Sequence, residues 1–226
     1  RRQRQMCIRD RSFWKEDQHE WYLLGKTFGG LEITNDNVTV NIVELFGKQL
    51  VNLLQVLLFH SEKPVQKDEL IDILWPESKN PSSALKFSIF RLRAELNEIE
   101  FFKDKEVIVT TRKGYILNPN LDWNIDFVEL EKAYNQINDG SELLDEKEFK
   151  TARKIFRLYQ GRFYASPSQL HWILQKQEIF RQMYVKTMMR TSCYLYTQKR
   201  YDEMMLMNYQ AVLIEPFNDC LLYTSP

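Results

Sequence analysis

The order of hydrophobic and polar positions predicts short strands and helices in the first part of the chain. Residues 28–42, FGGLEITNDNVTVNI, alternate apolar and polar around an Asn-Asp-Asn turn, which is typical of a hairpin. Residues 47–60, GKQLVNLLQVLLFH, are too long and too rich in leucine for a strand, and they predict a helix buried on nearly all sides. A shorter helix follows in KDELIDILW, residues 67–75, and Pro76 ends it.

The next helix, in KNPSSALKFSIFRLRAEL at residues 79–96, has a clear start and two different faces. Asn80 is a favourable N-cap residue, and Pro81 suits the first helical position because its missing N–H leaves no bond unmade there. Spacings of four, three and four define a buried stripe of Leu85, Ile89, Leu92 and Leu96. The opposite side carries Ser83, Phe87, Phe90, Arg91 and Ala94, flanked by Lys86 and Arg93. A merely solvated face would mix both signs of charge, so this basic and aromatic face indicates a binding surface.

Two β-rich runs follow this helix, and then the pattern becomes helical only. Runs 106–111 and 115–117 flank Arg-Lys-Gly, which predicts a hairpin with a basic tip at Arg112 and Lys113. A winged helix-turn-helix has this order of elements: a hairpin, then three helices, then a basic hairpin. Beyond a connection rich in proline and asparagine at 118–124, helical periodicity predicts helices at 125–138, 145–159, 168–199 and 201–214.

Composition and charge exclude several classes of protein. The 226 residues are 44% hydrophobic and 13% aromatic, which is enough for a packed core. No apolar run approaches the length of a membrane span and no signal peptide opens the chain, so we expect a cytoplasmic protein without a membrane partner. The net charge is zero, but residues 79–96 carry four basic side chains against Glu95, whereas residues 121–150 carry nine acids against three lysines. A basic segment followed by an acidic one can still bind DNA locally.

We interpret the two ends of the chain as encoded by DNA that is foreign to the gene. MCIRDR at residues 6–11 and CLLYTS at residues 220–225 can be encoded by complementary strands of one DNA word that resembles a sequencing adapter. We therefore interpret residues up to about 11 and from about 220 as adapter-derived, and we expect the native protein to continue beyond at least one end. Without Cys7 and Cys220, Cys193 remains, and we expect it to be a small buried residue.

Five segments in order resemble the SARP-type bacterial transcriptional activators, which join an OmpR-like winged helix to a helical domain related to tetratricopeptide repeats. The segments are ELIDILWP, NPSSALKFSIFRLRAEL, TTRKGYILNP, DWNIDFVELEKA and LYQGRF, and the resemblance spans about residues 28–218. In addition, KRYDEMMLMNYQAVLIEP is similar to the second half of a tetratricopeptide unit, with Tyr201, Ala211 and Pro216 at its marker positions. Met204 departs from that pattern, because a small residue is usual there.

The resemblance implies an α+β fold, a winged helix-turn-helix, followed by an all-α, tetratricopeptide-like domain. We place an OmpR-type winged-helix DNA-binding domain at residues 21–119 and the bacterial transcriptional activator domain, truncated in our interpretation, at residues 120–219. Residues 1–20 form an N-terminal segment, and residues 220–226 are adapter-derived.

The resemblance also implies a sequence-specific transcriptional activator that reads double-stranded promoter DNA with helix 81–97 and the wing at 106–117. The DNA-binding residues that we expect are Ser83, Lys86, Phe87, Phe90, Arg91, Arg93, Arg112 and Lys113. Phe87 stands where the family often has glutamine, and Phe90 stands where serine is common. A phenylalanine contacts a thymine methyl but cannot hydrogen-bond a base, so base preference should differ. In an alternative that stays open here, the two rings pack on the wing or on a partner subunit.

RNA polymerase and a second copy of the chain are further partners that the resemblance implies. Phosphate would repel the acidic helical half, so we expect that half to lie away from the duplex and residues 12–120 to bind DNA alone.

Nothing in the sequence predicts an enzyme. His19, His60 and His171 are scattered, no set of His, Cys, Asp and Glu has metal-ligand spacing, and no phosphate loop or nucleophile elbow occurs. We therefore expect no catalytic residue, no cofactor and no metal. The alternative function is a protein-interaction scaffold, in which the helical half binds a partner and the winged helix is a dimerisation or packing module. The basic charge of residues 81–97 favours DNA.

Overall fold

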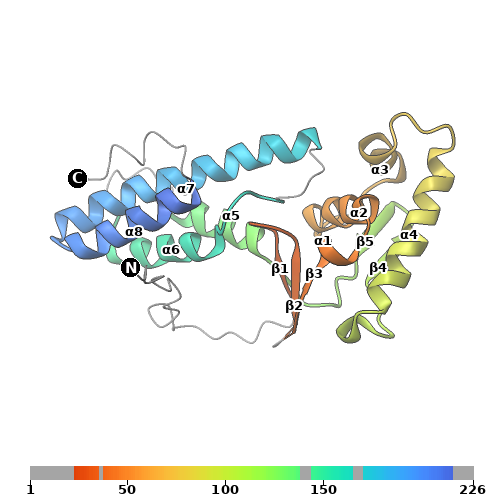
Figure 1. Cartoon of the computed structure of the whole chain (residues 1–226), viewed down its shortest axis with the longest axis horizontal. Coiled ribbons are helices and arrows are strands. Elements are labelled where there is room, and N and C mark those ends of the chain that lie inside the picture. Colours follow the sequence, from red (N-terminus) through yellow and green to blue (C-terminus); the bar gives the residue numbers. More distant parts are fainter. Residues whose placement is uncertain (1–22, 36–37, 138–143, 165–169, 216–226) are drawn as a thin grey trace, which may run out of the picture.

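The chain folds into a winged-helix half and a helical half that share one β-sheet (Figure 1). The computed structural model describes residues 23–35, 38–137, 144–164 and 170–215. The segments interpreted as adapter-derived, with Cys7 and Cys220, lie outside the described residues, as does part of the predicted Asn-Asp-Asn turn. The predicted fold class, α+β followed by all-α, is confirmed.

The elements of the winged-helix half follow the predicted order, with additions at its start. They are β1 (Leu23–Lys26), β2 (Glu32–Asn35), β3 (Val38–Asn41), α1 (Ile42–Leu45), α2 (Lys48–Phe59), α3 (Lys67–Leu74), α4 (Pro81–Asn97), η2 (Glu100–Phe102), β4 (Ile108–Thr111) and β5 (Gly114–Leu117). The remaining elements are β6 (Trp123–Ile125), α5 (Asp126–Ile137), α6 (Glu146–Leu158), α7 (His171–Thr197) and α8 (Tyr201–Ile214).

The first sheet has the strand order β3-β2-β1-β6 and joins the two halves. β1 pairs antiparallel with β2 and parallel with β6, where Leu24 lies opposite Asn124. The residues expected to form only a connection therefore contain a strand. The chain returns to β1 once more, because the amide of Tyr164 donates to the carbonyl of Thr27 at 2.7 Å and that of Gly29 donates to the carbonyl of Arg162 at 2.9 Å.

Asp126, the first residue of α5, ties the end of β1 to the helical half. It is 4% exposed and accepts from the amide of Thr27 at 2.7 Å, the hydroxyl of Thr27 at 2.5 Å and the amide of Phe28 at 3.1 Å. The amide of Phe127 donates to the same carboxylate at 2.7 Å. Burial raises the pKa of Asp126 from 3.8 to about 6, although each of these hydrogen bonds lowers it.

An aromatic cluster makes the core continuous across the two halves. Phe59 of α2 stacks on Phe127 of α5 with ring centroids 5.5 Å apart, and Phe28 lies 5.7 Å from Phe163 and 5.3 Å from Phe180 of α7. Aromatic side chains bury a large apolar area and prefer such tilted and offset contacts. Separation of the halves would expose these rings to water.

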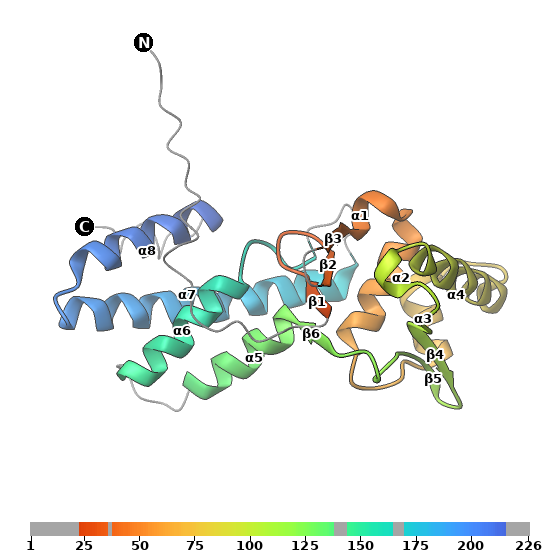
Figure 2. The ribbon, with the colours of Figure 1, turned by 90° about the horizontal axis from the view of Figure 1, so that it is seen from below.

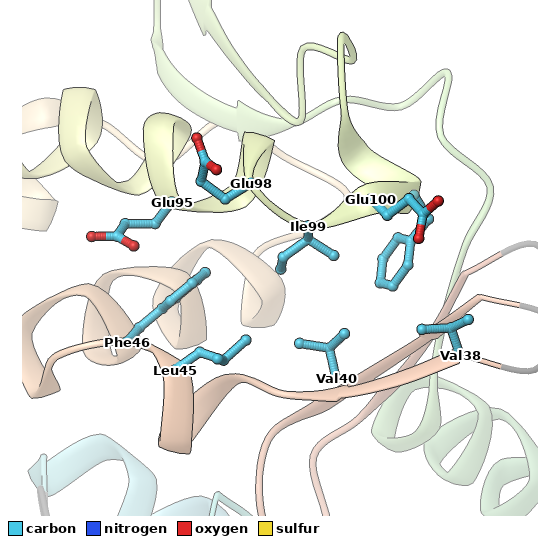
Figure 3. Close-up of a pocket in the computed structure, with 9 residues that line it drawn as sticks. Val38, Val40, Leu45, Phe46, Glu95, Glu98, Ile99 and Glu100 are labelled. Carbon is cyan, nitrogen blue, oxygen red and sulfur yellow. The ribbon is translucent and has the colours of Figure 1, made fainter.

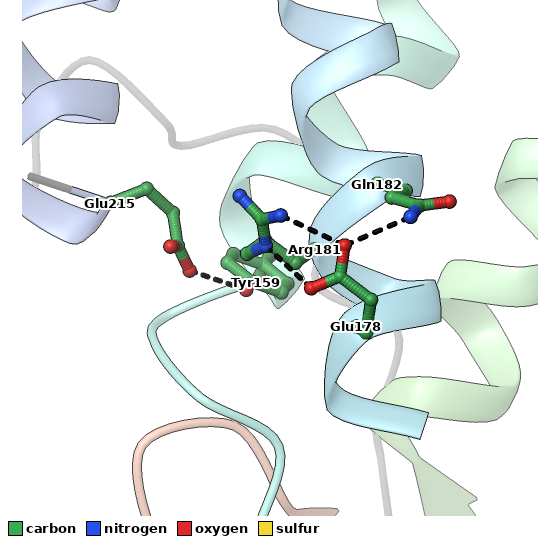
Figure 4. A network of polar contacts seen from close by, with 5 residues as sticks. All are labelled: Tyr159, Glu178, Arg181, Gln182 and Glu215. Atoms are coloured by element: carbon green, nitrogen blue, oxygen red, sulfur yellow. Dashed lines mark hydrogen bonds and ion pairs between the residues drawn. The ribbon is translucent and has the colours of Figure 1, made fainter. Parts of the chain in front are cut away.

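In the helical half, α5 to α8 pack against one another in sequence order, as Figures 1 and 2 show. Two neighbouring groups of polar contacts lie in this half (Figure 4). The hydroxyl of Tyr159, after α6, donates to Glu215, after α8, at 2.6 Å. Burial and this carboxylate raise the pKa of Tyr159 well above its usual range. On α7, Glu178 accepts from Arg181 at 2.8 and 2.9 Å and from Gln182 at 2.8 Å.

One expectation about this half is wrong. Cys193 is exposed, not buried, because it lies on the outer side of α7. The neighbours Thr191 and Ser192 are buried instead, with the hydroxyl of Ser192 donating to Asn208 of α8 at 2.7 Å.

Candidate nucleic-acid interface

Helix α4 is held in one orientation by its apolar stripe. Leu85, Ile89, Leu92 and Leu96 are each at most 2% exposed, which confirms the predicted inward face. Pro81 occupies the first turn as expected, but the side chain of Asn80 makes no capping bond. Instead the hydroxyl of Ser78 accepts from the amide of Asn80 at 3.3 Å.

The opposite side of α4 points into solvent with the residues that the sequence predicts. Ser83, Lys86, Phe87, Phe90 and Arg91 are exposed. Phe87 and Phe90 remain 60% and 70% exposed, so neither ring is packed on the wing. Arg91 lies 3.4 Å from Glu95 one turn further on, and an exposed ion pair of this kind contributes little to stability.

Arg93 has a different environment from the other predicted contacts. Its guanidinium donates to the carbonyl of Ile108 at 3.0 and 2.7 Å and to the hydroxyl of Thr110 at 2.8 Å, and the residue is half-buried. Both acceptors belong to β4, the first strand of the wing. Arg93 therefore joins α4 to the wing, a role that the sequence pattern did not indicate.

The wing is a tight hairpin whose tip carries two exposed cations, Arg112 and Lys113. Thr111 lies opposite Gly114 in the ladder, and its hydroxyl donates to the carbonyl of Gly114 at 3.0 Å and accepts from the amide of Lys113 at 3.2 Å. Gly114 has φ +145°, and a Cβ there would lie 1.8 Å from the carbonyl oxygen of Val65. The wing is thus pressed against the turn between α2 and α3.

Helix α4 and the wing lie at one end of the molecule, and α8 lies at the other end (Figures 1 and 2). The basic and aromatic face is therefore far from α6 and α8, whereas the start of α7 reaches α2. This placement is consistent with the expectation that the helical half stays away from a duplex bound at α4.

A second surface feature on this half has the opposite charge. An apolar groove of about 380 Å³ lies between β3, α1 and the end of α4 (Figure 3). Its lining is Val38, Val40, Leu45, Phe46, Ile99 and Phe101 with Glu95, Glu98 and Glu100. Three carboxylates repel phosphate, so this groove does not extend the surface for a nucleic acid.

The described residues hold neither a cluster of metal ligands nor a membrane-spanning helix. Within residues 23–35, 38–137, 144–164 and 170–215, no three His, Cys, Asp or Glu side chains gather as metal ligands would. Over the same ranges, no helix has the length and apolar character that crossing a membrane requires.

Comparison with known proteins agrees with this geometry. Residues 43–117 match the family described as "Transcriptional regulatory protein, C terminal". The matched stretch runs from α1 to the end of β5, so it contains α4 and the wing. A search of curated protein sequences finds no match to the chain.

Among solved structures, the chain is similar to Mycobacterium tuberculosis EmbR in complex with a low affinity phosphopeptide. The TM-score is 0.65 at 16% sequence identity, over 90% of this chain and 53% of that one. The chain thus spans about half the length of EmbR. A second match, the DNA binding domain of E. coli CadC, has 27% identity and a TM-score of 0.31 over 38% of this chain and 78% of that one.

The family match and the fold define the class of the first half of the chain. Residues 43–117 form an OmpR-like winged helix of the family described as "Transcriptional regulatory protein, C terminal". The EmbR match extends this likeness through the helical half, and with the family match it confirms the resemblance to SARP-type regulators at the level of the fold.

Proposed function

We propose that the chain binds double-stranded promoter DNA with α4 in the major groove and the wing on the adjacent backbone or minor groove. The observation that carries the proposal is the solvent-facing side of α4, where Lys86, Phe87, Phe90 and Arg91 lie opposite a fully buried stripe. Helices of this type read base edges, and cations beside them neutralise phosphates.

The exposure and the bonding partners of each predicted DNA-binding residue indicate the contact that we propose for it. Lys86 and Arg91 are exposed on the flanks of the reading face, where cations meet phosphate, and Ser83 is near the start of the helix. Arg112 and Lys113 are exposed at the wing tip, which suits a second backbone contact. We assign Arg93 the role of holding the wing at a fixed angle to α4, because β4 already accepts from its guanidinium.

We further propose that the protein is an activator that acts in the bacterial cytoplasm. In this proposal the helical half, at the far end from α4, contacts RNA polymerase or a second copy of the chain. The distance between α4 and the far end of the helical half supports the proposal, because a partner protein can then bind the helical half without displacing DNA from α4.

The test is a binding selection followed by a transcription assay. The full chain would be incubated with fragmented DNA from its own genome, and the retained duplexes would be measured by fluorescence anisotropy between 50 and 200 mM salt. We expect affinity to fall steeply with salt, by roughly three to five powers of ten for six to ten phosphate contacts. Affinity that does not change with salt would contradict DNA binding, and binding without increased transcription would contradict activation.

A second candidate function is the protein-interaction scaffold, and one observation favours it. On neighbouring turns of α8, the large apolar side chains of Met205, Leu206, Tyr209 and Leu213 are 50–56% exposed. Contiguous exposed apolar side chains mark protein contacts. Two measurements separate the scaffold from an activator that uses the same face. For a scaffold without DNA function, the wild type would show no salt-dependent binding to duplex DNA. For an activator, the double variant Leu206→Gln with Leu213→Gln should lose activation and keep its DNA affinity.

A further inference from the structure

We propose that Phe87 and Phe90 read the 5-methyl groups of two nearby thymines, so that the protein selects DNA sites by an apolar contact at the centre of its reading helix. This inference rests on the proposed binding of α4 in the major groove and names the kind of sequence that such a groove would present.

The position of the two rings carries the first step. They are three residues apart, so they lie on one face of α4 in neighbouring turns, with Cβ atoms about 5–6 Å apart. Lys86 and Arg91 flank them and are exposed as well. Because the stripe with Leu85 and Leu92 is fully buried, α4 cannot rotate to hide either ring without losing its core.

The exposure of the rings carries the second step. At 60% and 70%, Phe87 and Phe90 have the highest exposed fractions among the large hydrophobic side chains of α2 to α5 that the structure describes. An exposed aromatic pair on a surface is typical of a binding site. The cations Lys86 and Arg91 lie beside the two rings, and the phosphates of a nucleic acid would neutralise them. The surface therefore suits a nucleic acid better than an apolar protein.

The chemistry of the groove selects thymine. A phenyl ring neither donates nor accepts a conventional hydrogen bond, and the thymine methyl is the one apolar group that the major groove offers. Against the acceptors of guanine or the amino groups of adenine and cytosine, the ring would displace water and return no hydrogen bond, which disfavours those bases. Thymine is therefore favoured both by attraction and by exclusion of its competitors.

The spacing of the rings limits where the thymines lie. Bases along one strand are about 3.4 Å apart, so rings about 5–6 Å apart span between one and two steps. The expected site has two thymines at adjacent or next-adjacent positions of one strand, or one on each strand over the same short interval.

The experiment begins with the full chain and a random duplex library. After selection, each thymine of the best duplex would be replaced singly by deoxyuridine, which lacks the 5-methyl and keeps the pairing edge. We expect two positions at which the wild type loses affinity about fourfold each, which corresponds to burial of one methyl-sized group. At the other positions deoxyuridine should leave affinity unchanged.

Variants then assign each methyl to a ring. In Phe87→Ser one of the two positions should become insensitive to deoxyuridine, and in Phe90→Ser the other should. Leu45→Ser is the matched control, because Leu45 is 59% exposed and lies on α1, outside the reading face; it should keep both sensitivities. Circular dichroism would confirm that all three variants are folded.

Two results would overturn the inference and leave DNA binding intact: a tightly bound duplex in which no thymine is sensitive, or sensitivity that persists in both phenylalanine variants. A third result, no salt-dependent binding to any duplex, would contradict the proposed function itself and the inference with it.

Discussion

Gly114 is the residue on which the position of the wing depends most directly. Its φ of +145° disfavours any side chain, and a Cβ would overlap the carbonyl of Val65 at 1.8 Å. We expect Gly114→Ala to lower the free energy of unfolding by more than about 2 kcal/mol, since the strain adds to the loss of the contact between Val65 and Tyr115. Urea denaturation would measure the loss.

Gly30→Ala is the matched control for this substitution, because a Cβ at Gly30 meets no atom within 4 Å. It should change the free energy of unfolding by less than about 1 kcal/mol. If the two variants lost the same free energy of unfolding, the close approach of the wing to Val65 would not be what requires glycine at position 114.

Asp126 should give the fold a pH dependence with a definite sign. Its pKa is about 6 in the folded protein and near 3.8 when unfolded, so the folded state holds its proton more tightly. The stabilisation is therefore complete below pH 3.8 and is lost as the pH rises through about 6. Relative to Asp126→Asn, which does not titrate, the wild type should gain up to about 3 kcal/mol between pH 7 and pH 4.

Chemical denaturation of the wild type and Asp126→Asn at several pH values would measure this difference. A difference that falls as the pH is lowered would show that the four hydrogen bonds outweigh burial and hold the Asp126 carboxylate charged.

At the scale of the element, α4 depends on a strict division between its two faces. Leu92 is 0% exposed and Phe90 is 70% exposed, although the two residues are similar in hydrophobicity. We expect Leu92→Ala to cost about 2–5 kcal/mol of unfolding free energy because it leaves a cavity. Phe90→Ser should cost less than about 1 kcal/mol, which thermal or urea unfolding would show. A large loss for Phe90→Ser would mean that the faces are reversed.

The elements that depend on local patterns could be predicted from the sequence. The stripe of α4 and the helices at 126–137, 146–158 and 201–214 agree with the expected ranges within one residue, because helical periodicity over three or more turns is a strong signal. The exposed positions of Phe87 and Phe90 follow from the same pattern.

Features that depend on contacts distant in the sequence could not be predicted in this way. β6 has three residues and becomes a strand only because β1 lies beside it. The side chain of Arg93 looked like one more surface cation, yet the acceptors on β4 are 15 and 17 residues away. Cys193 was misplaced because a lone cysteine on a 27-residue helix carries no information about which side is covered.

At the scale of the whole molecule, the shared sheet changes what a fragment should do. A fragment that ends at residue 119 lacks β6 and Asp126, so β1 loses a neighbouring strand and the amides of Thr27 and Phe28 lose their acceptor. Phe28 and Phe59 would also lose aromatic neighbours. Residues 12–120 can therefore bind DNA alone only if they stay folded without these contacts.

We expect residues 12–119 to unfold at a lower temperature than residues 12–137, which retain β6, Asp126 and α5. Loss of one strand and a buried hydrogen-bonded carboxylate should cost several kcal/mol, which is most of the stability of a small domain. Calorimetry of the two fragments would measure the difference. Equal melting temperatures would show that the winged-helix half is independent of the residues after 119.

The central claim, that α4 presents its basic face to duplex DNA, is tested most directly by the salt dependence of binding. The measurement is the slope of log Kobs against log salt for the wild type, Lys86→Ala, Arg91→Ala and the control Lys150→Ala, whose lysine is exposed on α6 at a distance from α4. Each phosphate contact contributes about 0.9 to the slope, so Lys86→Ala and Arg91→Ala should each make it shallower by about that amount, and Lys150→Ala should leave it unchanged. Unchanged slopes for both α4 variants, in folded protein, would contradict the claim.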